Sequence, residues 1–166
     1  MAGTFSFDVV SDYDKGEMNN ILDQVQREIS TRYDFKGSAA EIDWSNGDKT
    51  GFQITGDHQF HLDAIIDMVR KKAAIRGVSQ KTFDTSKEPL TTNLKVRWEV
   101  PFLKGLDQDR AKKITALLRE TLPKVKAQIQ GEEVRIMSPK KDELQSAMDL
   151  LRDANFDFPL SFTNFR

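Results

Sequence analysis

The sequence contains no cysteine, only two histidines and no long apolar run. Without cysteine there is no disulfide, thiolate metal ligand or cysteine nucleophile, and this composition fits the reducing cytoplasm. No apolar stretch approaches the roughly 20 residues that span a bilayer. The N-terminus also lacks the basic and apolar regions of a signal peptide. We therefore expect a cytoplasmic protein with no membrane partner.

Residue patterns typical of catalysis and metal binding are also scarce. His58 and His61 lie close to Asp57 and Asp63, but no third strong ligand accompanies them, so we predict no metal site. There is no Ser–His–Asp or paired-carboxylate motif, and no glycine pattern of the Walker or dinucleotide-binding type. The sequence predicts no cofactor, and enzymatic activity is the least supported function.

Hydrophobic periodicity predicts the same order of elements in each half of the chain: strand, helix, hairpin, helix, strand. In the first half these are a strand at 4–10, a helix to about residue 31, a hairpin around Asn46–Gly47, a helix near 57–73 and a weak strand at 78–83. A polar linker, 84–93, follows. In the second half they are a strand at 94–100, a helix ended by Pro123, a hairpin at 124–137, a helix after Ser138 and a strand near 158–162.

This order predicts an α+β protein of two tandem ferredoxin-like βαββαβ domains, each an antiparallel sheet with two helices on one face. We place the division at residue 90, giving units 1–90 and 91–166. Because the strand at 78–83 is weak, a second arrangement stays open. In it the strand 4–10 pairs with the second sheet and the strand 94–100 with the first.

Charge is distributed unevenly between these halves. Residues 1–90 hold 11 Lys/Arg and 15 Asp/Glu, a net charge of -4, whereas residues 91–166 hold 14 and 11, a net charge of +3. An anionic ligand is therefore expected on the second half.

The polar positions of the second half form the first candidate site. Six cationic or amide side chains share one phase across three predicted strands: Lys95, Arg97, Lys126, Gln128, Gln130 and Arg135. Lysine and arginine bind phosphate, and glutamine can hydrogen-bond a base edge. The alternative is a solvated sheet face. The corresponding face of the first sheet is predicted to carry Asp8, Glu41 and Asp43, which would repel phosphate.

Two further segments are candidates. Lys104 and Gly105 precede a helix start, where free backbone N–H groups favour anions. In the segment Arg32–Lys36 (RYDFK), Arg32 and Tyr33 can stack on a base or contact phosphate. Alternatively, Tyr33 and Phe35 pack this loop onto the core while Arg32 pairs with an acid.

Four segments together resemble the YajQ-like family of bacterial proteins: SFDVVS (6–11), RYDFKG (32–37), KVKAQIQGEEVRI (124–136) and NFR (164–166). The resemblance covers essentially the whole chain. It implies two ferredoxin-like domains with exchanged N-terminal strands and a cytosolic protein that binds nucleotides without an assigned reaction. Cyclic dinucleotide sensing and RNA- or transcription-linked roles have been proposed within that family.

We therefore expect a non-enzymatic nucleotide-binding protein, with a cyclic dinucleotide sensor acting through a regulatory protein partner as its more specific form. Its expected binding residues are the cations Arg32, Arg97, Lys104, Lys126 and Arg135 and the amides Gln128 and Gln130. An RNA- or DNA-associated module is the alternative, and a module that binds only proteins is a further one.

Overall fold

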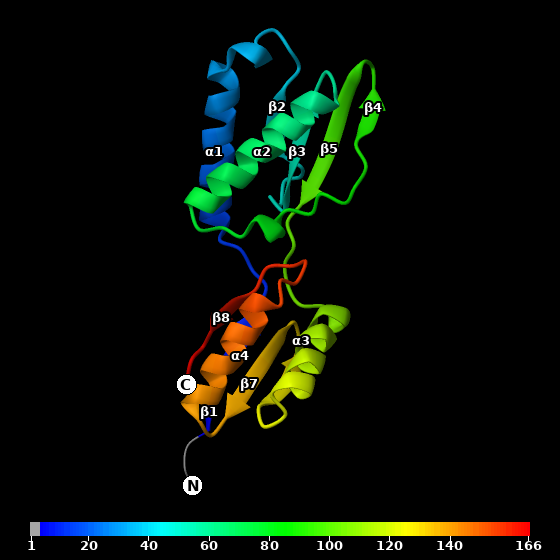
Figure 1. Cartoon of the computed structure of the whole chain (residues 1–166). Coiled ribbons are helices and arrows are strands. Elements are labelled where there is room, and N and C mark those ends of the chain that lie inside the picture. Colours follow the sequence, from blue (N-terminus) through cyan, green and yellow to red (C-terminus); the bar gives the residue numbers. More distant parts are fainter. Residues whose placement is uncertain (1–3) are drawn as a thin grey trace. The chain divides into compact units, whose positions relative to one another are not determined.

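The computed structural model describes residues 4–166, which form two compact units (Figure 1). Unit 1 consists of two separate stretches, 4–12 and 104–166, and unit 2 consists of residues 13–103. The boundaries therefore fall near residues 12 and 103, not at residue 90.

Unit 2 contains a four-stranded antiparallel sheet in the order β2-β3-β5-β4. Its elements are α1 (Lys15–Thr31), β2 (Glu41–Trp44), β3 (Gly51–Gly56), α2 (Gln59–Ile75), β4 (Leu90–Thr92) and β5 (Lys95–Pro101). Two short 3-10 turns, η1 (Tyr33–Phe35) and η2 (Gln80–Thr82), lie in the connections. Both helices cover the same face of the sheet (Figure 1).

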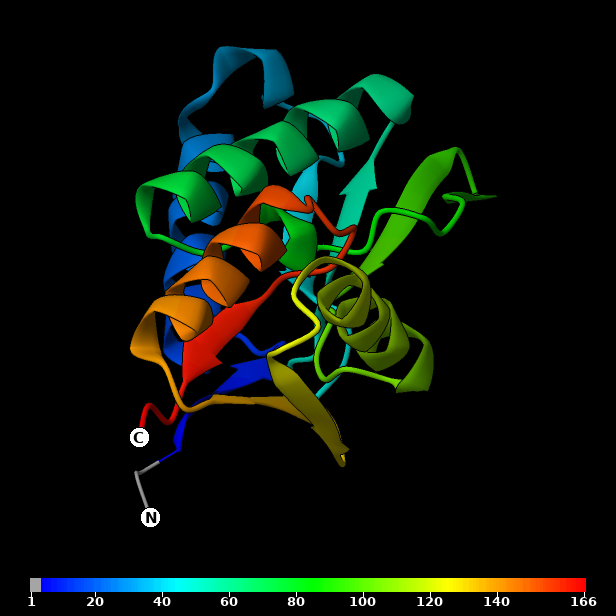
Figure 2. The same cartoon turned by 60° about the horizontal axis from the view of Figure 1, so that its bottom comes forward.

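Unit 1 contains a second antiparallel sheet in the order β6-β7-β1-β8. Its elements are β1 (Phe5–Val10), α3 (Gln108–Thr121), β6 (Lys126–Gln130), β7 (Glu133–Ser138), α4 (Lys141–Asp153) and β8 (Ser161–Thr163). Figures 1 and 2 show α3 and α4 on one side of this sheet. The prediction of an α+β protein with two ferredoxin-like units is confirmed.

The sheet position that β1 holds in unit 1 is held by β5 in unit 2. The first strand of the chain thus pairs with β7 and β8, and β5 pairs with β3 and β4. The charge asymmetry between the halves disappears with these boundaries. Unit 1 has 12 Lys/Arg and 12 Asp/Glu, and unit 2 has 13 and 14, so their net charges are 0 and -1.

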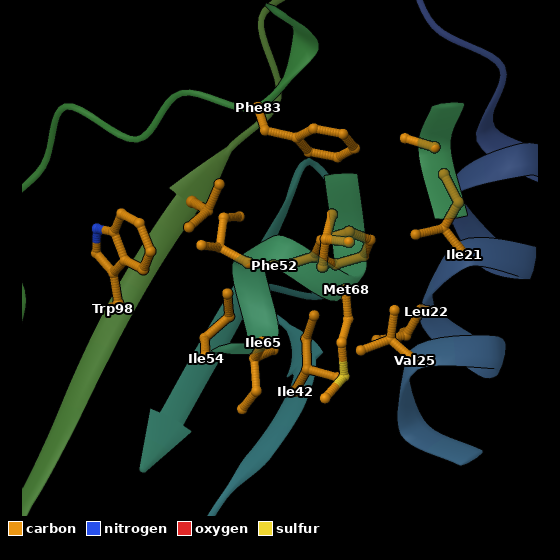
Figure 3. Packing of buried hydrophobic residues seen from close by; sticks show 14 of the residues in the cluster. Ile21, Leu22, Val25, Ile42, Phe52, Ile54, Ile65, Met68, Phe83 and Trp98 are labelled. Carbon is orange, nitrogen blue, oxygen red and sulfur yellow. The ribbon is translucent and has the colours of Figure 1, made fainter. Parts of the chain in front are cut away.

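The core of unit 2 forms where the alternating apolar positions of the sheet meet the apolar stripes of both helices (Figure 3). Phe52, Ile54 and Trp98 come from the sheet, and Val25 of α1 and Ile65 of α2 face them. All five are buried. Each such side chain contributes about 1.5–3 kcal/mol on removal from water, which holds both helices on one face.

The core of unit 1 is built in the same way. Phe7 of β1 and Ile136 of β7 are neighbours across the sheet and are fully buried. Leu118 of α3 and Leu151 of α4 are buried as well. Within residues 4–166 no helix covers the opposite face of this sheet.

One predicted strand is wrong. Residues 78–83 contain the 3-10 turn η2, and Phe83 forms only an isolated bridge with Phe102. The strand that completes the unit 2 sheet is β4, which lies within the predicted linker. Its sequence, LTT, is exposed at every position and therefore has no apolar alternation to reveal it.

Candidate functional site

The helix-free face of the unit 1 sheet, called here the open face, carries four of the predicted binding residues. Gln128, Arg135, Asp8 and Thr163 are successive neighbours in one row across four strands. Lys126 lies opposite Met137, and Gln130 lies opposite Glu133. The structure therefore brings Lys126, Gln128, Gln130 and Arg135 together, as their common phase predicts.

The other three predicted residues lie elsewhere. Arg97 is in β5 of unit 2, where it is opposite Thr55 and Leu90. Arg32 follows α1 in unit 2, and Lys104 precedes α3 in unit 1. The prediction of one face across three strands fails for Arg97 because β5 pairs with the strands of the first half.

Arg135 is held by a buried carboxylate. Its Nε donates a hydrogen bond to Asp8 Oδ1 at 3.0 Å, and Nη2 lies 3.5 Å from Oδ2. Asn164 Nδ2 donates to the same Oδ2 at 2.8 Å. Asp8 is only 4% exposed, and the hydrogen bond from Arg135 lowers the pKa of its carboxyl. Nε and Nη2 of Arg135 are therefore engaged by Asp8.

This ion pair also corrects the expectation for Asp8, which was predicted to lie on the first sheet. Asp8 and Arg135 are 127 positions apart in the chain. They meet because β1 pairs with β7, with Asp8 directly opposite Arg135. The sequence leaves open which of the two sheets the strand 4–10 joins, and with it the position of Asp8.

A hollow of ≈ 370 Å³ lies along the outer edge of β6 and is called here the β6-edge hollow. Lys126 and Gln128 of β6 line it together with Arg119 and Thr115 of α3, and Met137, Leu118 and Val125 supply apolar surface. Among the described residues no carboxylate lines it. Arg119 and Lys126 are exposed, and neither has an ion-pair partner among residues 4–166.

Sequence reasoning missed Arg119. The residue lies in the last turn of α3, and the chain reaches Lys126 after the stop at Pro123. A helix that ends just before an edge strand places its last turn beside that strand, so the short spacing of Arg119, Pro123 and Lys126 was the available signal.

Lys104 lies in acidic surroundings. Its Nζ is 3.9 Å from Asp12 Oδ1, and the hollow that it lines also receives Glu132 and Glu133. A Cβ placed on Gly105 would come within 2.9 Å of the Glu132 carboxylate. Three carboxylates around one ammonium group disfavour a phosphate at this position.

Arg97 lines a hollow of mixed charge on unit 2. Glu88, Glu99 and Lys87 are also in its wall, and Lys87 Nζ pairs with Glu99 Oε2 at 3.1 Å. Arg97 itself is exposed and makes no ion pair with the described residues.

The RYDFK loop is fixed from within. Arg32 donates through Nε and Nη2 to the two carboxylate oxygens of Asp34, at 3.0 and 2.8 Å, and this pairing lowers the pKa of Asp34. The Arg32 guanidinium also lies 4.8 Å from the ring centroid of Phe35. Phe35 is buried against His61, with ring centroids 5.5 Å apart. Tyr33, in contrast, is 88% exposed.

The two histidines lie at the start of α2, with their ring centroids 4.6 Å apart. His61 is buried, and its Nδ1 accepts a hydrogen bond from the backbone N–H of Asp57 at 3.0 Å. Within residues 4–166 no three His, Cys, Asp or Glu side chains cluster as metal ligands would. No helix among these residues combines the length and the apolarity that crossing a membrane requires.

Comparison with known proteins gives a consistent result. Residues 5–166 match the family model described as "Nucleotide-binding protein YajQ-like". A nucleotide-binding protein of Trichodesmium erythraeum (strain IMS101) is 43% identical over 166 residues, covering 100% of both chains. One of Synechococcus sp. (strain CC9605) is 44% identical over 168 residues, again covering 100% of both. One of Leptospira biflexa (strain Patoc 1 / Ames) is 41% identical over 167 residues, covering 100% of this chain and 99% of the relative.

Proposed function

Because the chain belongs to the YajQ-like family of nucleotide-binding proteins, we propose that it binds a nucleotide in the β6-edge hollow of unit 1 and catalyses no reaction on it. The observation that carries this proposal is that Arg119 and Lys126 line the same hollow. Among the described residues neither has an ion-pair partner, and no carboxylate lines the hollow. Such a site attracts phosphate, whereas the hollows around Lys104 and Arg97 include acids.

In this proposal the phosphate contacts Arg119 and Lys126, and the Gln128 amide hydrogen-bonds the base or the ribose. Met137 and Leu118 offer an apolar surface against which a base can lie. The volume of ≈ 370 Å³ is within the range of about 300–1,000 Å³ that holds small ligands. Arg135 remains paired with Asp8. It lies beside the site as the cross-strand neighbour of Gln128 and does not bind the phosphate in this proposal.

The decisive variant is Arg119→Glu/Lys126→Glu. It replaces both cations, so nucleotide affinity should fall at least about a hundredfold, since each reversal removes one charge-assisted contact worth about 1.5–3 kcal/mol. The matched control is Lys112→Glu/Lys124→Glu, which changes net charge equally on α3 and on the segment before β6. Neither Lys112 nor Lys124 lines the hollow.

Methionine methyl resonances provide the readout. Met137 lines the β6-edge hollow, whereas Met18 and Met68 are buried in the core of unit 2. Titration with mononucleotides and cyclic dinucleotides should shift the Met137 methyl signal and leave the other two unchanged. A nucleotide that binds without moving Met137, or that binds the double variant normally, would remove the site from this hollow.

The more specific form of the proposal is a sensor of cyclic dinucleotides. A sensor requires that the ligand bind two states of the protein with different affinity, so that a regulatory protein partner recognises one of them. A thermal-shift screen of mono-, di- and cyclic dinucleotides tests the ligand class. A ligand at a hundredfold excess over its dissociation constant stabilises the folded state by about 2.7 kcal/mol. A selective response to a cyclic dinucleotide supports the sensor, and an equal response to all mononucleotides contradicts it.

Exposure of Tyr33 favours the alternative of RNA or DNA binding. Its ring is free to stack, and Lys36 in the same loop is exposed and makes no ion pair with the described residues. Affinity for a single-stranded oligonucleotide should then fall linearly with salt on logarithmic axes and should drop in Tyr33→Ala. An affinity that Tyr33→Ala leaves unchanged would argue against this surface.

A further inference from the structure

The segment Asn164–Arg166 continues the unit 1 sheet beyond β8 through a one-residue bulge. Thr163 is opposite Asp8, while Arg166 and Ser6 exchange two backbone hydrogen bonds, N to O, of 3.0 and 3.2 Å. Between these two pairs, Asn164 and Phe165 therefore lie opposite the single residue Phe7 of β1. The extra residue is Asn164, with φ 56°, the left-handed conformation that the first residue of a G1-type bulge adopts.

The bulge gives Phe165 a fixed position next to β1. Its ring lies 5.9 Å from the ring of Phe7, with an angle of 30° between the planes. Although the backbone around it is hydrogen-bonded, Phe165 is 62% exposed. An aromatic ring held in place but left open to solvent can pack against a ligand.

A second hollow of ≈ 370 Å³ opens beside Phe165, between β1 and α4. Phe5, Phe165, Leu144 and Met148 make it mainly apolar, and Lys141 and Gln145 of α4 supply polar groups. It shares no lining residue with the β6-edge hollow. We call it the α4 hollow.

The charged side chains that line the α4 hollow, Lys141 and Arg166, are both positive. Lys141 Nζ lies 5.0 Å from the ring centroid of Phe5 and has no ion-pair partner among the described residues. No Asp or Glu side chain of residues 4–166 lines the hollow. Gln145 Nε2 donates to Asp149 Oδ1 at 3.1 Å, so its carbonyl oxygen remains as an acceptor.

We propose that the α4 hollow is a binding site for a small aromatic anion: a flat ring that carries a carboxylate, sulfonate or phosphate. The ring packs between Phe5 and Phe165 over Leu144 and Met148. The anionic group pairs with Lys141, and a donor on the ring meets the Gln145 carbonyl. This site is separate from the proposed nucleotide site, and each can be tested without the other.

The test uses 1-anilinonaphthalene-8-sulfonate, an aromatic ring system with one fixed negative charge, on the full chain. Met148 lines the α4 hollow and Met137 lines the other, so methyl spectra locate the bound probe. We expect the Met148 signal to shift. Binding should weaken about tenfold in Lys141→Glu, because the ion pair becomes a repulsion. It should weaken about fivefold in Phe165→Leu, which removes ring packing but keeps an apolar side chain.

Lys140→Glu is the matched control. Lys140 adjoins Lys141, is exposed and does not line the hollow, so its reversal should leave affinity within about twofold. Lys141→Met removes the charge while keeping an apolar stem and replaces Lys141→Glu if that variant unfolds. An unshifted Met148 signal, or equal losses in Lys140→Glu and Lys141→Glu, would overturn the proposal. Neither result bears on nucleotide binding, which is followed at Met137.

Discussion

The ion pair between Asp8 and Arg135 predicts that its two partners are not equally important for stability. Arg135→Gln leaves the Asp8 carboxylate buried, with Asn164 as its one remaining side-chain donor among residues 4–166. Removing one partner of a buried pair typically costs 3–5 kcal/mol, and because one donor remains we expect about 3 kcal/mol. Asp8→Asn removes the buried charge itself and leaves an arginine that water can reach, so the loss of this charge-assisted hydrogen bond should cost about 1–2 kcal/mol.

The double variant Asp8→Asn/Arg135→Gln separates this explanation from a simple loss of packing. It contains no buried charge, so its free energy of unfolding should exceed that of Arg135→Gln alone. A double-mutant cycle would then give a favourable coupling between the two positions.

The contribution of Asp8 to the free energy of unfolding should change with pH in opposite directions in the native protein and in Arg135→Gln. In the native protein the pKa of Asp8 is lowered by the hydrogen bond from Arg135. The stabilisation from this carboxylate is therefore complete above the pKa of the unfolded group, about 4, and is lost as pH falls through the lower folded value. In Arg135→Gln burial raises the pKa, so acidification protonates Asp8 and reduces the penalty.

Urea unfolding followed by two signals can assign these effects to unit 1. Both tryptophans, Trp44 and Trp98, and both tyrosines belong to unit 2, so tryptophan fluorescence reports that unit, whereas far-UV circular dichroism reports both. The variants should change the circular dichroism transition. The reasoning would be refuted if Arg135→Gln were no more destabilising than Asp8→Asn, or if the double variant were less stable than Arg135→Gln.

Two further predictions concern unit 2. Leu94→Gly should raise the free energy of unfolding by about 0.5–1 kcal/mol in urea denaturation, because Leu94 has φ 66° and is 94% exposed in the β4–β5 turn; a loss of stability would show that the leucine packs. Phe35→Ala should cost about 3 kcal/mol by the same assay, since it opens a cavity against His61, while Tyr33→Ala should cost under about 0.5 kcal/mol because its ring is exposed.

Periodicity predicts most of the fold because burial imposes it. The helix stripes and the alternation in β6 and β7 are each repeated over several residues, and the structure places these elements where the sequence does. β4 is not predicted because its three residues are all exposed and show no apolar alternation. In contrast, Val78 and Phe83 look like a strand because their apolar side chains pack onto the core of unit 2.

The candidate site is predicted only in part because a site depends on which strands are neighbours. Lys126 and Gln128 share a strand, so their common face follows from spacing alone. Arg97 leaves the set because β5 pairs with β3. The engagement of Arg135 depends on β1 lying beside β7, and the hollow depends on Arg119, which no strand pattern includes.

The course of the chain through the two sheets has a consequence for how the protein can be divided. Unit 2 is an insertion into unit 1, and its own order of elements is a circular permutation in which β5 comes last instead of first. The two chain segments of unit 1 lie next to each other at the insertion point, since Gly105 N–H donates to Ser11 O at 2.6 Å. The two ends of unit 2 also lie next to each other, since the ring centroids of Tyr13 and Phe102 are 5.1 Å apart. A short linker that joins residue 12 to residue 104 should therefore preserve unit 1. Residues 13–103 should fold separately as unit 2. A cut at residue 90 would instead deprive each sheet of a central strand.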